Sequence, residues 1–294
     1  MYYTKRPVPH TVTTILILLA ITFHSFLMNG FFHASRFLNV ATYTTPLVAQ
    51  SDPSLFQKSL YVQSLNEKGA RLSLMHDLVP SLLRHIDLET FALIQWLLCL
   101  LLTVCALFYL GKTFIGTDWA GYATALLFST KLNEWTLGSP AIYINFFHHG
   151  LQWAIALNIL SLTLIFRKRL PRAFLLMGIA WNFHPMSVMF LFFLFFPYWV
   201  FHRKEIRLKT LLLCSVLFAL PALPMLIKSF TYLTMTWDYG PEWITAVKWT
   251  AWYTLFPSTW SLDWFFRAGL YLWLFVMGIA ALPASDKKEL VSSL

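Results

Sequence analysis

The chain has 294 residues, of which 58% are hydrophobic and 12% are charged, and its formal net charge is +9. An ordinary soluble domain is roughly 45–50% apolar and about 25% charged. The composition therefore excludes a soluble globular domain, a disordered chain and a secreted disulfide scaffold. The positive charge does not indicate nucleic-acid binding, because Lys and Arg occur in short clusters between apolar runs and no nucleic-acid-binding motif is present. The sequence predicts an all-α integral membrane protein with several spans.

The N-terminal part predicts one membrane span followed by a long external loop. The apolar run 10–27 follows Lys5 and Arg6, which the positive-inside rule places in the cytoplasm, and no small-x-small cleavage site follows it. Residues 30–90 carry charges that nearly cancel, as is typical of a non-cytoplasmic loop. Within this loop, apolar residues recur at three- and four-residue steps between positions 72 and 86. This period predicts an amphipathic helix on the membrane surface, which Pro80 breaks or restarts.

The middle of the chain contains three more apolar runs that predict crossings, at residues 91–110, 119–132 and 151–166. Lys112 marks the cytoplasmic side between the first and the second of them. An apolar, aromatic connector at 138–150 leads into the third and ends in the pair His148 and His149. These runs continue the alternation of cytoplasmic and external ends.

The next apolar run, residues 173–201, is predicted to enter and leave the membrane on the same side. A cluster of four Lys or Arg residues flanks it on each side, and a single crossing would place one cluster outside. The natural break is Asn182-Phe183-His184-Pro185, since proline interrupts a helix and restricts the residue before it. The arm that ends at His184 would be about 17 Å long. The sequence therefore predicts a helical hairpin that reaches about half the depth of the hydrocarbon core.

Two further runs, 210–227 and 264–281, complete the predicted topology. Between them lies a second external loop, 228–263, whose high Trp content is typical of a membrane interface. The whole chain, 1–294, is then a single transmembrane domain with about six crossings and one half-depth hairpin. Both termini are expected in the cytoplasm.

Few residues offer chemistry, since no metal-binding motif, phosphate-binding loop, dinucleotide fingerprint or nucleophile elbow is present. Three segments are expected to bring titratable groups toward one external-side cavity, namely Asp52, His148 with His149, and His184. An ionisable residue at membrane depth is costly to bury and indicates function. Each group also has a structural interpretation. Asp52 would cap a short helix, the paired histidines would lie in the interface, and His184 would bond carbonyls freed by the break.

Three short stretches resemble the GT-C superfamily of membrane glycosyltransferases, and within it the bacterial proteins related to mannosyl- and arabinosyl-transferases. They are Gln50-Ser51-Asp52-Pro53-Ser54-Leu55-Phe56, Phe183-His184-Pro185 and Leu255-Phe256-Pro257-Ser258-Thr259-Trp260. With the predicted layout of helices, the resemblance covers most of the chain. It implies a GT-C-like helix bundle in the bacterial inner membrane. It also implies a transferase that takes its sugar from a polyprenyl-phosphate donor.

The resemblance also implies roles for individual residues. In GT-C enzymes an acidic residue of the first external loop acts as a base or orients the acceptor, and Asp52 fits that position, with His184 as a second catalytic candidate. Four residues are expected to bind the lipid phosphate, namely His148, His149, Arg36 and Lys58. The best-defined members have paired acids in this loop, whereas here Asp52 stands alone until Glu67. Some families of this superfamily add a divalent metal, but a single acidic candidate does not support one here, so no cofactor is expected.

Two other classes of function were weighed against the transferase. GT-C enzymes usually continue with more helices or a soluble external domain, so a shortened module retained as a non-catalytic structural subunit of a larger membrane complex is the alternative. Its Phe-rich helices would then pack against partner proteins. A transporter is disfavoured, because the sequence has no inverted repeat and no charged residues for ion coupling inside the predicted helices.

Overall fold

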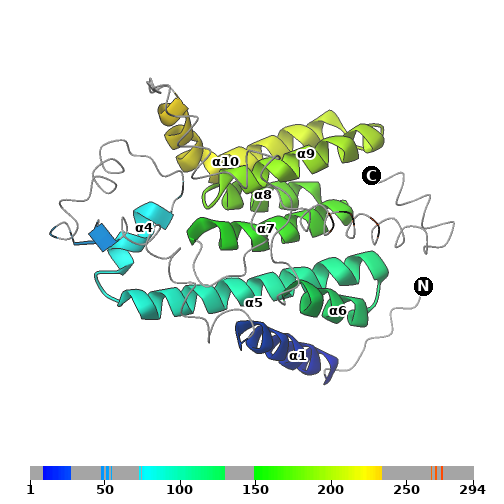
Figure 1. The fold of residues 1–294 in the computed structure, drawn as a ribbon. Coiled ribbons are helices and arrows are strands. Elements are labelled where there is room, and N and C mark those ends of the chain that lie inside the picture. Colours follow the sequence, from blue (N-terminus) through cyan, green and yellow to red (C-terminus); the bar gives the residue numbers. More distant parts are fainter. Residues whose placement is uncertain are drawn as a thin grey trace.

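The computed structural model describes residues 9–27, 48–49, 51–52, 54, 73, 75–129, 149–233, 266, 269 and 273. Every regular element in these ranges is helical, so the predicted all-α class is confirmed for this part of the chain (Figure 1). The helices are α1 (Pro9–Phe26), α4 (Met75–Leu82), α5 (Leu88–Ile115), α6 (Asp118–Ser129), α7 (His149–Phe166), α8 (Leu170–Trp181), α9 (Pro185–His202) and α10 (Leu208–Leu233).

Among the described residues, two helices are long and apolar enough, by length and composition, to cross a membrane: Leu88–Ile115 and Leu208–Phe230. The first has well-defined ends, because the side chain of Asp87 accepts a hydrogen bond from the backbone N–H of Thr90 and Gly116 adopts a positive φ of 79° at the C-terminus. At 1.5 Å per residue, 28 residues rise about 42 Å, more than the roughly 30 Å of a hydrocarbon core. These two helices indicate association with a membrane.

The helices pack into one bundle with two apolar cores. One core lies among α7, α8, α9 and α10 and includes the fully buried Met177 and Cys214. The other lies among α1, α5 and α6 and includes Trp96 and Leu100. Helix α5 connects the two halves, since it packs against α1 and α6 on one side and against α7 on the other (Figure 1).

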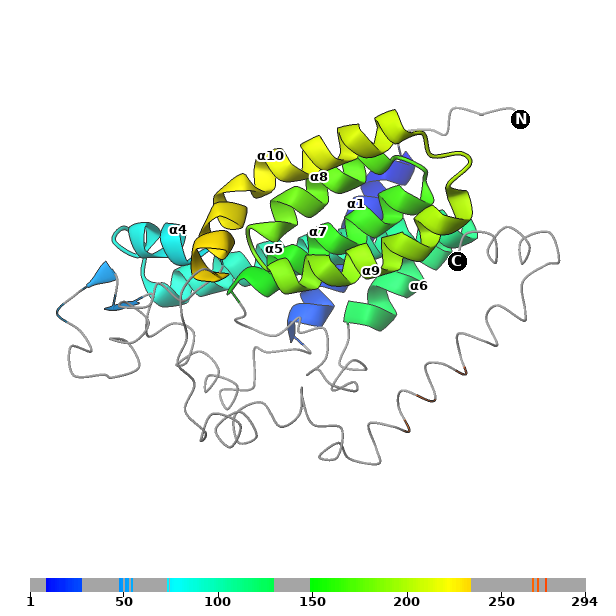
Figure 2. The same cartoon turned by 90° about the horizontal axis from the view of Figure 1, so that it is seen from above.

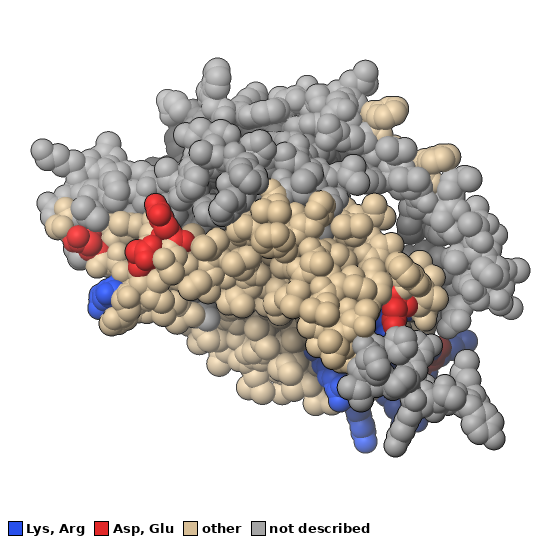
Figure 3. Space-filling model, turned by 90° about the horizontal axis from the view of Figure 1, so that it is seen from below, with Lys and Arg blue, Asp and Glu red and all other residues tan. Residues whose placement is uncertain are grey.

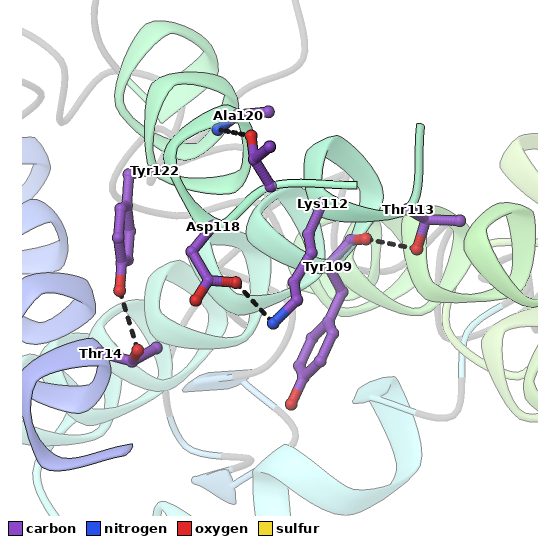
Figure 4. A network of polar contacts seen from close by, with 8 residues as sticks. Thr14, Tyr109, Lys112, Thr113, Asp118, Ala120 and Tyr122 are labelled. Carbon is purple, nitrogen blue, oxygen red and sulfur yellow. Dashed lines mark hydrogen bonds and ion pairs between the residues drawn. The ribbon is translucent and has the colours of Figure 1, made fainter. Parts of the chain in front are cut away.

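From α5 to α10, successive helices along the chain run in alternating directions, as short contacts between their ends show. The turn from α5 to α6 is closed by an ion pair between Lys112 and Asp118 at 2.6 Å (Figure 4). Helix α1 begins near this turn, because the hydroxyl groups of Thr14 and Tyr122 lie 2.8 Å apart. Helix α1 therefore starts at the end of the bundle where α5 stops and α6 starts.

The same end holds the turns after α7 and α9. Arg167 Nε donates to Thr113 Oγ1 at 2.9 Å, which joins the end of α7 to the end of α5. Lys168 and Glu205 form an ion pair at 3.1 Å, which joins the start of α8 to the end of α9. We call this end, with Lys112 and residues 167–172 and 203–209, the basic end. Viewed from below, the charged side chains of the described residues lie at two ends with an uncharged surface between them (Figure 3).

The predicted interruption of the 173–201 run lies where the sequence places it. Helix α8 stops at Trp181 and α9 starts at Pro185. The two arms fold back on each other, since the Lys168–Glu205 ion pair joins their far ends and the rings of Phe174 and Phe195 are 5.0 Å apart between them. Both flanking basic clusters therefore lie at one end of the bundle. The depth of this hairpin in a membrane stays a prediction.

Other boundaries differ from the sequence prediction. Helix α5 extends beyond 91–110 at both ends, because Lys112 pairs with Asp118 and lies over the Phe108 ring at 5.7 Å without ending the helix. The described part of α6 has 12 residues, a rise of about 18 Å, and residues 130–132 of the predicted 119–132 span lie outside the described residues. Pro80 lies inside α4 and does not break it. Most of 228–263 and 264–281 lies outside the described residues.

Candidate functional site

The sequence nominates six site residues, and the structure describes three of them in whole or in part. Asp52 and His184 are described, and the backbone of His149 begins α7. The remaining three lie outside the described residues, namely His148, Arg36 and Lys58.

Two of the nominated segments meet at the end of the bundle opposite the basic end. Gly150, in the first turn of α7, is buried against the turn between α8 and α9. A Cβ atom at Gly150 would overlap the carbonyl oxygen of Phe183 and would lie 2.8 Å from Oγ of Ser73. In the sequence, His149 immediately precedes Gly150, and His184 immediately follows Phe183. Ser73 brings in the first loop, so three separate segments converge here.

Helix α4 covers this contact. Val79 is fully buried, with Leu83, Phe91, Trp153 and Phe183 packed around it. The rings of Trp153 and Phe183 stack with centroids 6.0 Å apart, which fixes the first turns of α7 to the α8–α9 turn. The predicted surface helix of the first loop is thus packed on the bundle by its apolar face. We call this region, with Ser73, α4, the first turns of α7 and residues 181–187, the opposite end.

His184 caps α9. Its Nδ1 accepts a hydrogen bond from the backbone N–H of Ser187 at 3.1 Å, and its carbonyl oxygen accepts one from Ser187 Oγ at 2.8 Å. Ser187 Oγ in turn accepts a hydrogen bond from Asn158 Nδ2 of α7 at 3.0 Å. An imidazole that accepts at Nδ1 is neutral and carries its proton on Nε2. The ring is partly buried, and Nε2–H is the atom left to donate to a ligand.

The structural interpretation of His184 is that it bonds carbonyl groups near the helix break. Asn182 makes such bonds in the structure. Its Nδ2 donates to the carbonyl oxygen of Gly178 at 3.1 Å and to that of Pro221 in α10 at 2.6 Å. Gly178 allows this approach, since a Cβ there would overlap the carbonyl oxygen of Phe218. The break between α8 and α9 is therefore bonded to α10 through a buried amide.

Sequence reasoning missed three residues of this network, Asn158, Asn182 and Ser187. Asn158 and Asn182 are 9% and 6% exposed, and within the described part of the chain the Oδ1 atom of each has no hydrogen-bond partner. Buried polar atoms are nearly always paired, so unpaired ones indicate a functional role or an absent partner. The sequence does contain a signal for one of these residues, because Asn158 is an amide within the otherwise apolar run 151–166.

Asp52 lies in a local turn. Its Oδ1 accepts hydrogen bonds from the backbone N–H of Ser54 at 3.0 Å and from Ser54 Oγ at 2.6 Å. These bonds, the side-chain one first, hold the pKa of the Asp52 carboxyl below its usual value. A carboxylate of low pKa is a weak base at neutral pH but a good hydrogen-bond acceptor. Figures 1 and 2 place the short segment around residue 50 beside α4.

The described residues contain no group of three His, Cys, Asp or Glu side chains placed to hold a metal ion. No protein-family model, curated protein or solved structure matches the chain. The chemical interpretation of the opposite end therefore rests on its geometry and on the sequence motifs.

Proposed function

We propose that the protein is a polyprenyl-phosphate-sugar-dependent glycosyltransferase of GT-C type, which acts on the non-cytoplasmic face of the bacterial inner membrane. The observation that supports this most is the contact of Gly150 with Phe183 and Ser73. It gathers the first loop, the start of α7 and the hairpin turn at one end of the bundle. Each of these three regions contains or adjoins residues that the sequence nominates for catalysis or for donor binding.

The proposed topology has about six crossings and a half-depth hairpin, with both termini in the cytoplasm. The basic end would face the cytoplasm, because short loops rich in Lys and Arg are retained there. The opposite end would then face the external leaflet, where a lipid-linked sugar donor presents its phosphate.

In the proposed reaction, a hydroxyl oxygen of the acceptor attacks the anomeric carbon of the donor sugar. The bond between that carbon and the phosphate oxygen breaks, the phosphate leaves with the electron pair, and the hydroxyl proton passes to a base. Nε2–H of His184 would donate to the phosphate, and Asp52 would orient the acceptor hydroxyl or take its proton. His148, His149 and a cation, Arg36 or Lys58, would complete the phosphate site.

The capping geometry of His184 supplies a variant that separates function from folding. In His184→Asn, Oδ1 can take over the hydrogen bond from the Ser187 N–H, as Asn is a preferred helix cap, but the Nε2–H donor is lost. His184→Ala removes both. Native mass spectrometry of the protein in mild detergent would measure retained polyprenyl phosphate. We expect wild type to retain the lipid and both variants to lose it, with His184→Asn as stable as wild type. Absence of the lipid from wild type, or equal retention in His184→Asn, would contradict the proposal.

A second candidate function is that of a non-catalytic subunit in a larger membrane complex. It is favoured by the apolar surface of α9 and α10. Only 17% of the membrane-spanning stretch of α10 is buried, compared with 56% of the corresponding stretch of α5. Phe190, Phe193 and Phe196 of α9 are also more than 60% exposed. The same mass spectra distinguish the two candidates, because a subunit would carry partner proteins at fixed stoichiometry and no polyprenyl phosphate.

A further inference from the structure

We propose that Asn158 is a positioning residue that holds His184 as a neutral hydrogen-bond donor, with its proton on Nε2. The ligand to which His184 donates, a phosphate oxygen, rests on the proposed function, whereas the positioning itself does not. The proposal assigns a task to an amide that neither the sequence motifs nor the proposed roles include.

The state of the His184 ring follows from its contact with the first turn of α9. Pro185 has no N–H group, and the next N–H that the His184 side chain accepts is that of Ser187. An imidazolium has protons on both nitrogens and cannot accept this bond. The contact therefore selects the neutral ring and, of its two tautomers, the one with the proton on Nε2.

Ser187 is itself held from a neighbouring helix. Its hydroxyl donates to the carbonyl oxygen of His184 and accepts from Asn158 Nδ2, 29 residues earlier on α7. Three hydrogen bonds thus link His184 and Ser187, because the Ser187 N–H also donates to the His184 carbonyl oxygen at 3.2 Å. Asn158 ties this turn to α7 by a hydrogen bond, beside the apolar packing of the fully buried Val188.

The stability of the fold does not explain why position 158 is an asparagine. The residue is 9% exposed, and within the described residues its Oδ1 has no hydrogen-bond partner. Burying an unpaired polar atom is unfavourable, and an apolar side chain of similar volume would avoid this. Its Nδ2 bond to Ser187 is therefore the feature that explains an amide here.

The tautomer of His184 determines whether this residue can act as a hydrogen-bond donor or as a base at the opposite end. A ring locked with its proton on Nε2 donates to an anionic oxygen but cannot take a proton at Nε2. His184 is thus assigned as a phosphate donor and not as the base. The proton of the acceptor hydroxyl is left to Asp52 or to the departing phosphate.

The test is nuclear magnetic resonance of protein labelled with ¹⁵N-histidine, in which the two ring nitrogens report tautomer and hydrogen bonding. The His184 signals are assigned by their loss in His184→Asn. We expect wild type to show a neutral ring with protonated Nε2 and a hydrogen-bonded Nδ1. Asn158→Leu should give a mixture of tautomers, and Ser187→Ala, which removes the same link from the α9 side, should do the same. Ser161→Ala removes a buried hydroxyl one turn further along α7, where its Oγ bonds the Leu157 carbonyl, and should leave the His184 signals unchanged.

A proton on Nδ1 in wild type, or unchanged His184 signals in both Asn158→Leu and Ser187→Ala, would overturn the positioning role. Titration with polyprenyl phosphate and with inorganic phosphate separates this result from the proposed function. We expect the lipid to bind and Asn158→Leu to weaken that binding about three- to tenfold, within the range of one ordinary hydrogen bond. If the tautomer shifts as expected but wild type binds inorganic phosphate alone, or neither compound, the positioning role stands and the lipid-linked donor is wrong.

Discussion

The two ends of the bundle place polar groups in different ways. At the basic end the charged side chains are exposed, and the ion pair of Lys168 with Glu205 has side chains 65% and 61% exposed. Exposed pairs of this kind contribute about 0–1 kcal/mol. At the opposite end, beside exposed charged groups such as Asp87, two uncharged amides are buried, and Asn158 and Asn182 bond across helices. Charge at the basic end suits orientation in a membrane, whereas the buried amides at the opposite end fix geometry.

The largest effect is expected where three segments touch at the opposite end. Gly150→Val would push a side chain into the Phe183 carbonyl and toward Ser73, so we expect the free energy of unfolding to fall by about 1–3 kcal/mol, the usual range for overpacking. Unfolding with increasing SDS would measure it. Gly116→Asn is the control at the basic end, because nothing lies within 4 Å of a Cβ there and Asn tolerates the left-handed φ. Equal stability of both variants would show that the Gly150 contact is absent.

A matched pair of polar deletions tests the comparison directly. Asn182→Leu removes the hydrogen bonds of a buried amide to the carbonyls of Gly178 and Pro221, and should destabilise by about 1–3 kcal/mol because both carbonyls lose a donor where water has little access. Thr113→Val at the basic end also removes two bonds, with Arg167 and Tyr109, but both are exposed. Water replaces them there, so we expect a change within about 0.5 kcal/mol. A larger loss of stability for Thr113→Val than for Asn182→Leu would contradict the expected difference between the two ends.

The sequence predicts the features that depend on local pattern. The basic clusters, the apolar runs and the break before Pro185 are each properties of adjacent residues, and the helices and the interruption follow them. The partners of buried amides are not local, because Asn158 bonds a residue 29 positions away and Asn182 one 39 positions away. The C-terminal end of α5 depends on a contact between residues only six positions apart. Lys112 looks like an end signal until its partner Asp118 is known.

The smallest expected effect concerns Asp87, the carboxylate that caps the start of α5 at the opposite end. The backbone N–H of Thr90 holds the pKa of Asp87 below its usual value of 3.8. A lowered folded-state pKa stabilises the fold fully above the unfolded value, and this contribution is lost as the pH falls through the folded value. Asp87→Asn keeps a capping oxygen but does not titrate. We therefore expect wild type to be slightly more stable than Asp87→Asn in SDS unfolding between about pH 5 and 7, with the difference shrinking below about pH 4. A difference that grows on acidification would contradict this sign.

Because Asp87 is exposed, the effect should also weaken in salt, as at the basic end. That result would make burial, and not position in the bundle, the property that separates the two kinds of polar group.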